Sequence, residues 1–301
     1  MNEVELIGLR GRNPLGFLAA LGVLTLIDGV NREPNTVSLC WTDSLDPHAI
    51  LKSGIDPLDL PDRLLAGLHG LRNGSVLGCE LRDVKFDPPQ KGRPNVPLRS
   101  WIQSADSALE LELIRALVVE GAVDGGGASK PSHLHFSAGQ QQFLDIAREV
   151  FDATLGDPPR LGEALFGPWR FDGQAKNFGW AAGTDRIYAL RGFNPSSEKR
   201  LGVPAADALA FVGLSCLPVW ERREQAVTTA CAKLWKTSDL TWPLWKFPLS
   251  RSVVKASLAS EKERPSEAAR RGVLEILTAP IKRTDQGGYG SFGAPTSEPT
   301  Q

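Results

Sequence analysis

The chain has 301 residues, of which 23% are charged, and its formal net charge at pH 7 is −1. This length is enough for one large domain or two, and the near-zero charge gives no global electrostatic sign of a polyanion-binding protein. The four cysteines lie far apart without a C-x-x-C pair, and the four histidines show no zinc spacing. We therefore expect reduced cysteines, with no structural metal and no cofactor.

The first strong signal along the chain is the apolar stretch from Leu15 to Ile27. It is too short to span a bilayer, and no small-x-small cleavage site follows it. A glycine-rich phosphate loop is also excluded, because neither G-x-G-x-x-G nor Gly-Lys-Ser/Thr is present here. Asn13 is a good N-cap, and Pro14 suits the first helical position. The sequence predicts an interior helix over 14–28, in a cytoplasmic protein with no membrane contact.

The rest of the chain alternates strand-like and helix-like segments. Strands are expected at 3–10, 36–41, 79–87, 185–193, 224–235 and 240–249. Two short helices are expected within 46–71, the second at 61–71, and further helices at 101–119, 249–260 and 265–277, together with a second mostly apolar helix at 204–217. The tail of 265–277 could also be a strand. The fold class is therefore α+β, with central buried helices packed against mixed or antiparallel strands. We divide the chain into an N-terminal α/β part (1–100), an α+β main part (101–285) and a flexible tail (286–301).

The segment after Asp124 reads "GGGASKPSHLHFSAGQQQ" and carries several local signals. It is not a phosphate loop, because Ser129 and Pro131 occupy the positions around Lys130 where Gly and Ser or Thr are needed. A short strand is expected over 132–136, which would place His133 and His135 on the same side. Ser137 and Gln140 match a capping box for the helix that follows. We interpret both histidines as structural or surface residues.

Basic residues gather in separate runs despite the balanced total. Residues 85–99 carry a net charge of +3, and residues 246–283 carry +5. We expect these runs to converge on a groove that follows a phosphate backbone. The predicted nucleic-acid contacts are Lys91, Arg93, Arg99, Arg191, Lys199, Arg200, Lys282 and Arg283.

Four ordered motifs suggest a family. They are "GRNPLGFLAALGVLTLID", "LHFSAGQQQFL", "DRIYALRGFNPSS" followed by "ADALAFVGLSCLPV", and "WPLWKFPLS". This order resembles the accessory and large-subunit-like proteins of type I-G (formerly I-U) CRISPR–Cas systems, over residues 5 to 255. The resemblance implies a non-catalytic subunit of a type I CRISPR RNA-guided surveillance complex in antiviral defence. Its partners would be other effector subunits, crRNA and target DNA.

Two other functions stay open from the residues. A metal-dependent nuclease or hydrolase would use the segment from Asp124 to His135, with Glu120 and Lys130 nearby, although such enzymes usually place at least two carboxylates on the metal. A pure protein-binding scaffold would show an exposed patch built from Trp220, Trp235, Trp242 and Trp245. No G-x-S-x-G, H-E-x-x-H or D-x-D motif is present, so we expect no catalytic residues.

Overall fold

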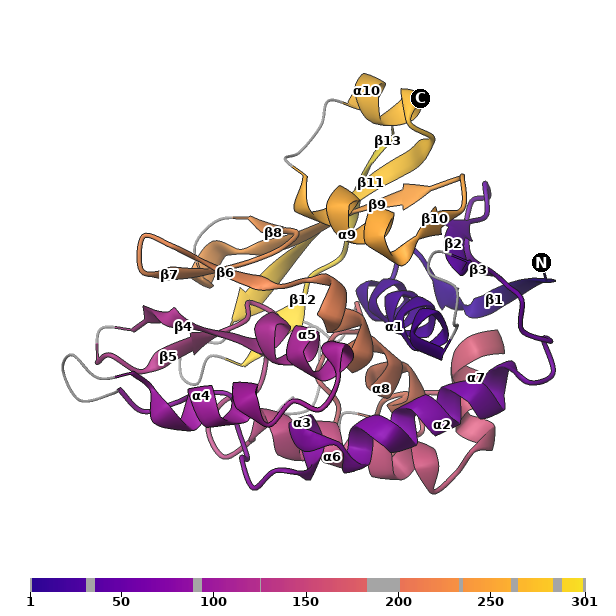
Figure 1. The fold of residues 1–301 in the computed structure, drawn as a ribbon. Helices are drawn as coiled ribbons and strands as arrows, with labels where there is room; N and C mark the ends of the chain where they lie inside the picture. The colour runs from indigo at the N-terminus through magenta and orange to yellow at the C-terminus, as the bar shows by residue number, and fades with distance from the viewer. Residues whose placement is uncertain are drawn as a thin grey trace, which may run out of the picture.

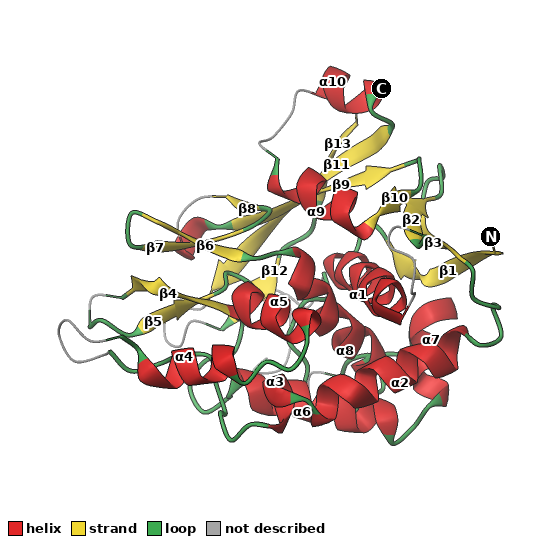
Figure 2. Cartoon of the chain, in the orientation of Figure 1, coloured by secondary structure: helices red, strands yellow, loops and turns green. Residues whose placement is uncertain are grey.

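The structure is a computed structural model of the chain. It describes residues 2–30, 36–88, 94–124, 126–182, 201–232, 235–260, 265–283 and 289–299. Figures 1 and 2 show sheets on one side of the molecule and most helices on the other, with α1 (Pro14–Val30) and α8 (Pro204–Gly213) between them. The predicted α+β class is confirmed.

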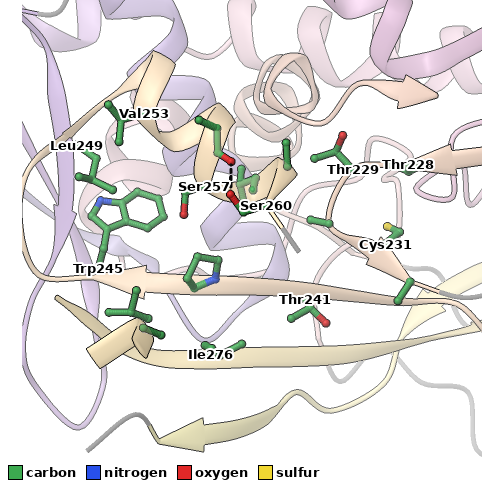
Figure 3. A pocket seen from close by; sticks show the side chains of 18 of the residues that line it. Thr228, Thr229, Cys231, Thr241, Trp245, Leu249, Val253, Ser257, Ser260 and Ile276 are labelled. Carbon is green, nitrogen blue, oxygen red and sulfur yellow. Dashed lines mark hydrogen bonds between the residues drawn. The ribbon is translucent and has the colours of Figure 1, made fainter. Parts of the chain in front are cut away.

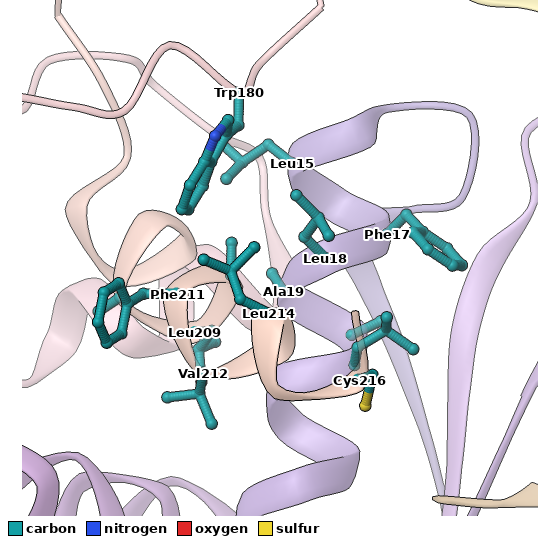
Figure 4. Packing of buried hydrophobic residues seen from close by; sticks show 14 of the residues in the cluster. Leu15, Phe17, Leu18, Ala19, Trp180, Leu209, Phe211, Val212, Leu214 and Cys216 are labelled. Atoms are coloured by element: carbon teal, nitrogen blue, oxygen red, sulfur yellow. The ribbon is translucent and has the colours of Figure 1, made fainter. Parts of the chain in front are cut away.

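The two mostly apolar helices form the centre of the core, as predicted. Asn13 caps α1, since its side-chain oxygen accepts a hydrogen bond from the Leu15 backbone N–H at 3.1 Å. Helix α8 is buried along its whole length and continues into the 3₁₀ turn η2 (Leu214–Cys216). Figure 4 shows Leu18 of α1 beside Leu214, while Phe17 points to the opposite side. There Phe17 meets the rings of Trp41 and Trp242.

The helices α1 and α8 touch through their backbones. A Cβ atom on Gly22 would lie 1.9 Å from the carbonyl oxygen of Leu209, and one on Gly213 would lie 2.0 Å from that of Leu18. No side chain fits at either position, so glycine is required for this close approach. One core cluster extends from Val4 to Phe292. The expected parts 1–100 and 101–285 therefore share a single core.

The first sheet has the order β1 (Asn2–Arg10), β3 (His48–Ser53), β2 (Ser38–Trp41) and β10 (Leu249–Ser250). All of its pairs are antiparallel. It covers one side of α1. The indole N–H of Trp245 donates to the Leu39 carbonyl at 2.6 Å and so links this sheet to the second one.

The second sheet has the order β12 (Gly290–Phe292), β11 (Val273–Arg283), β9 (Asp239–Trp245) and β8 (Cys231–Ala232). Strand β13 (Thr296–Pro299) also pairs with β11. Two of these strands lie in the expected C-terminal tail, which thus contributes to the sheet. Strand β11 begins at Val273, so the tail of 265–277, for which a helix or a strand was expected, is a strand.

Two hairpins and several helices complete the fold. The hairpins are β4 (Val118–Val123) with β5 (Ser129–Pro131), and β6 (Val219–Arg222) with β7 (Gln225–Thr228). The helices are α2 (Leu60–Asn73), α3 (Ser75–Gly78), α4 (Val96–Gln103), α5 (Ala108–Leu117), α6 (Phe143–Leu155), α7 (Pro159–Phe166), α9 (Arg251–Ala259), α10 (Pro265–Arg270) and the turn η3 (Trp235–Thr237). Among the described residues, no helix is long and apolar enough to cross a membrane.

Several local predictions were wrong. Strand β3 stands where the first of the two short helices was expected. Residues 79–87 form no strand, because the guanidinium of Arg148 binds the carbonyls of Leu77, Cys79 and Leu81. The expected helix 101–119 is interrupted between α4 and α5, where the Ser107 hydroxyl accepts from the Glu110 N–H and starts a new helix.

Another wrong prediction is the strand expected over 132–136, because residues 132–137 form a turn. The His135 N–H donates to the Ser132 carbonyl at 3.0 Å, and the Thr228 hydroxyl accepts from the His133 N–H at 2.8 Å. The expected capping box is absent as well, since α6 begins at Phe143 after Gln142. The strand expected at 185–193 lies outside the described residues.

Candidate binding groove

A cavity of about 820 Å³ lies between α9, α10 and the outer face of the second sheet. Its volume is in the range of ligand-binding pockets. Figure 3 shows Trp245, Leu249 and Val253 at one end of it and Thr228, Thr229 and Cys231 at the other. We call this cavity the groove. Its lining is mostly apolar, and several of its side chains are as small as alanine: Ala230, Ala232, Ala256, Ala259 and Ala268.

The alternation of strand β9 and the period of helix α9 create the groove. In β9, Trp242 and Leu244 are buried in the core, while Thr241 and Pro243 on the opposite face line the groove. In α9, Val254 and Leu258 are buried against the core. The small side chains of Ala256, Ser257 and Ala259 then lie along the cavity.

Two threonine hydroxyl groups of the groove wall bond to other protein groups. Thr229 Oγ1 donates to the Pro218 carbonyl at 2.8 Å and accepts from the Trp220 indole N–H at 2.9 Å. Thr241 bonds to Thr278 at 3.0 Å. Burial raises the pKa of the Cys231 thiol, which is therefore protonated and a poor nucleophile. The groove presents apolar surface more than reactive groups.

Behind the groove wall lies a buried polar cluster centred on Thr228. Its hydroxyl contacts the Ser132 hydroxyl at 3.2 Å and His133 Nδ1 at 3.1 Å. Burial, together with the positive charge of Arg283, lowers the pKa of His133 to about 4. The histidine is therefore neutral at pH 7 and supports the wall from inside.

His135 is bonded differently from His133. Its Nε2 contacts Asp83 Oδ1 at 2.7 Å and Ser137 Oγ at 3.3 Å. Complete burial lowers the pKa of His135, although the hydrogen bond with Asp83 raises it. A Ser-His-Asp triad needs the acid and the serine on opposite ring nitrogens. Because both groups share Nε2 here, the three residues do not have triad geometry.

The predicted nucleic-acid contacts have separate environments where the structure describes them. Lys91, Arg93, Arg191, Lys199 and Arg200 lie outside the described residues. Arg99 pairs with Glu120 at 2.9 Å and is more than half exposed. Lys282 is exposed at the end of β11.

Arg283, next to Lys282 in sequence, points inward. Its guanidinium donates to the carbonyls of His133 and His135 at 2.7 and 3.1 Å and lies 3.7 Å from the ring centre of Trp235. Burial lowers its pKa to about 10, so it remains charged at neutral pH. These bonds make Arg283 a link between β11 and the 132–137 turn.

The residues of the nuclease or hydrolase alternative have different partners. Asp124 accepts from the backbone N–H groups of Gly126 and Ala128 in a turn, and Glu120 binds Arg99. His133 bonds to Thr228, as described above. Across the described ranges, no group of three or more His, Cys, Asp or Glu side chains is placed to hold a metal ion.

The expected tryptophan patch is only partly formed. Trp242 and Trp245 are buried, and Trp235 lies against Arg283 and His133. Trp220 is 56% exposed and lines the groove together with Trp245. The groove residues of α9 were not predicted from the sequence. The pattern that could have revealed them is a run of small side chains on one face of this helix.

We compared the chain with family models, curated proteins and solved structures, and none of these matches it.

Proposed function

We propose that this chain is a non-catalytic subunit of a type I CRISPR RNA-guided surveillance complex in the cytoplasm. In this proposal it binds another subunit through the groove and contacts crRNA and target DNA. The groove supports the binding role. Covering its apolar lining with an apolar surface of a partner would remove both surfaces from water, which favours binding. The sequence resemblance supplies the kind of assembly.

The mouth of the groove favours a protein partner over a small molecule. Trp220 and Val253 at its edge are 56% and 47% exposed, and Phe247 is 58% exposed beside Gly272. A small molecule inside the cavity would leave these side chains in water, whereas a protein surface would cover them as well. Among the described residues that line the groove, Arg271 is the one that is charged. Depletion of charge around exposed tryptophan and arginine is typical of the centre of a protein interface.

The nucleic-acid part of the proposal depends on the basic segment before α4. Asn95, just after this loop, donates from its side chain to the Asp87 carbonyl at 3.2 Å, and its backbone N–H donates to Glu120. Arg99 binds the same Glu120. The two ends of the segment that carries Lys91 and Arg93 therefore meet beside Arg99, which supports a shared contact with phosphate groups.

The test is co-expression with crRNA and the subunits encoded by neighbouring genes, followed by size-exclusion chromatography. Ala256→Trp fills the groove and should remove the chain from the complex, with an unchanged circular dichroism spectrum. Leu58→Ser is the matched control, since Leu58 is 87% exposed and does not line the groove. Normal assembly of Ala256→Trp contradicts the groove as the docking site. Neighbouring genes without CRISPR subunits contradict the assembly proposed.

A second arm of this test measures binding of crRNA against salt concentration. Replacing Lys91 and Arg93 together by alanine should lower the slope of log affinity against log salt by about 1.4 to 1.8, since each lost phosphate contact contributes about 0.7 to 0.9. An unchanged slope contradicts the role of this basic segment and leaves the groove proposal intact.

A further inference from the structure

A stripe of side chains along helix α9 forms one wall of the groove. Val253, Ala256, Ser257 and the C-cap Ser260 line the cavity, and their spacing of i, i+3, i+4 and i+7 places them on one helical face. Figure 3 shows Val253, Ser257 and Ser260 following one another along α9. At 1.5 Å per residue the stripe is about 10 Å long, which is about two turns. The side chains after Val253 are small, so another element can lie close to the α9 backbone.

The opposite wall is the outer face of strand β9, which is a poor template for an added strand. Strand β9 pairs with β11 along one edge. On its other edge, the Thr241 N–H donates to the Ala230 carbonyl at 2.8 Å. Pro243, two residues further on, faces the same edge and has no N–H. An extended peptide in the groove would therefore find few backbone groups to pair with along β9.

The hydroxyl groups of the groove also favour an occupant that satisfies its own backbone. Thr229 and Thr241 bond to other protein groups, as described above. The Ser260 hydroxyl donates to the Ala256 carbonyl at 2.9 Å. An extended peptide between these walls would give up water at its N–H and C=O groups without replacing those bonds. A helix makes these bonds within itself and can present an apolar face to the walls.

One end of the groove carries a positive charge. Val273 pairs with Trp245 in the second sheet, so Arg271, two residues earlier, lies at the Trp245 end of the groove. Arg271 is exposed, and no Asp or Glu is found among the described residues that line the cavity. A carboxylate of a partner would complement this end, because opposite charges across an interface fix its register and specificity.

We propose that the partner covers the groove with an amphipathic α-helix. This inference rests on the proposed function of the groove as a docking site. Large apolar side chains on one face of the helix pack between α9 and β9, and the small residues of α9 allow the two helices to approach closely. A carboxylate near one end of the helix pairs with Arg271. The exposed side chains of Trp220 and Val253 at the rim are covered by the same helix.

The test is fluorescence anisotropy of the full chain with labelled peptides of about 20 residues, long enough to form a helix alone. One peptide places leucines on one helical face and glutamates at both ends. A second has the same composition, with its leucines alternating as in a strand. The helical peptide should bind at least about tenfold more tightly, which corresponds to about 1.4 kcal/mol. Ala256→Trp should weaken its binding by at least about tenfold, whereas Leu58→Ser should leave it unchanged.

A third peptide, with lysines in place of the glutamates, tests the charge. Arg271→Glu should weaken binding of the glutamate peptide and strengthen binding of the lysine peptide, each by about twofold to fivefold, as is typical of exposed ion pairs. Arg63→Glu reverses the charge of an exposed arginine of α2 outside the groove and should change neither. If Ala256→Trp fails to fold, this exchange at the exposed Arg271 still locates the bound peptide.

Equal binding of the helical and alternating peptides, or no binding of either, would overturn the helical occupant. Unchanged affinities in Arg271→Glu would overturn the pairing with a carboxylate. Loss of Ala256→Trp from the co-expressed complex, together with a preference for the alternating peptide, would keep the groove as the docking site and reject the helix. Normal assembly of Ala256→Trp, together with tight binding of the helical peptide, would keep the helix and contradict the proposed complex.

Discussion

Small side chains have opposite effects in two regions of this molecule. Between α1 and α8, Gly22 and Gly213 let the helix backbones touch and leave no space. Between α9 and β9, Ala256 and its neighbours border a cavity of about 820 Å³. Small residues border both regions, but the backbones of α1 and α8 touch, whereas α9 and β9 stay apart.

The position of α9 explains why the groove stays open. Arg251 at its first residue donates to the Thr25 hydroxyl of α1 at 3.2 Å and to Glu112 of α5. Lys255 binds the same Glu112 at 2.7 Å. These bonds hold α9 toward the helical side of the protein, so its outer face does not close on the sheet. Small residues bring two elements together only where nothing else fixes their separation.

The largest expected effect is at the α1–α8 contact. Gly22→Ala should lower the free energy of unfolding by more than about 3 kcal/mol, because overpacking against the Leu209 backbone cannot be relieved by a rotamer change. Urea denaturation measures this. Gly29→Ala in the same helix is the control, since its Cβ would meet no atom within 4 Å, and it should be neutral or stabilising. Equal effects of the two changes would contradict the close contact.

The sequence predicted the helix α1 well because its signals are local. Asn13 and Pro14 start it, and the apolar run makes it interior. The turn at 132–137 could not be predicted in this way. Its alternating pattern favours a strand, but Thr228 and Arg283 bind it from 95 and 150 residues away. Such bonds override a weak local preference.

The groove was equally hidden from the sequence. The separation between α9 and the second sheet depends on the bond between Arg251 and Glu112, which are 139 residues apart in the sequence. The Ser107 N-cap of α5 was a local signal, yet the continuous apolar pattern of 101–119 concealed it. Of the eight predicted basic contacts, the structure describes three, and Arg283 shows why residue type alone is insufficient: an interior cation has the same sequence appearance as a surface one.

The two regions should also differ in their response to pH. Burial raises the pKa of Asp207 in α8 to about 7, against 3.8 in the unfolded chain. Stability from this group is complete below pH 3.8 and is lost as the pH rises toward 7. As the pH rises across this window, Asp207→Asn should therefore become more stable relative to the wild type, by on the order of 4 kcal/mol for about 3 pKa units at 1.36 kcal/mol each.

His133, behind the groove wall, should show the opposite trend. Its pKa is about 4 in the folded protein and 6.5 in the unfolded chain, so stability is lost as the pH falls from 6.5 to 4. At the acid end of this range, the free energy of unfolding of His133→Asn should rise relative to that of the wild type. Urea denaturation of each variant at pH 4, 5, 6 and 7 separates the two trends, and parallel curves would contradict the burial of either group.

The smallest effects come from one substitution made in both regions. Ala208 in α8 is fully buried, so Ala208→Leu should destabilise the protein by about 2 kcal/mol through overpacking. Ala256→Leu adds the same atoms at the groove, where space exists, and should change the free energy of unfolding by less than about 0.5 kcal/mol. Thermal and urea denaturation of both variants measure the contrast. A large loss in Ala256→Leu would mean that α9 closes on β9 in solution. The groove would then lack the room that the docking proposal needs, whereas an intact Ala256→Leu shows that its space is available to a partner.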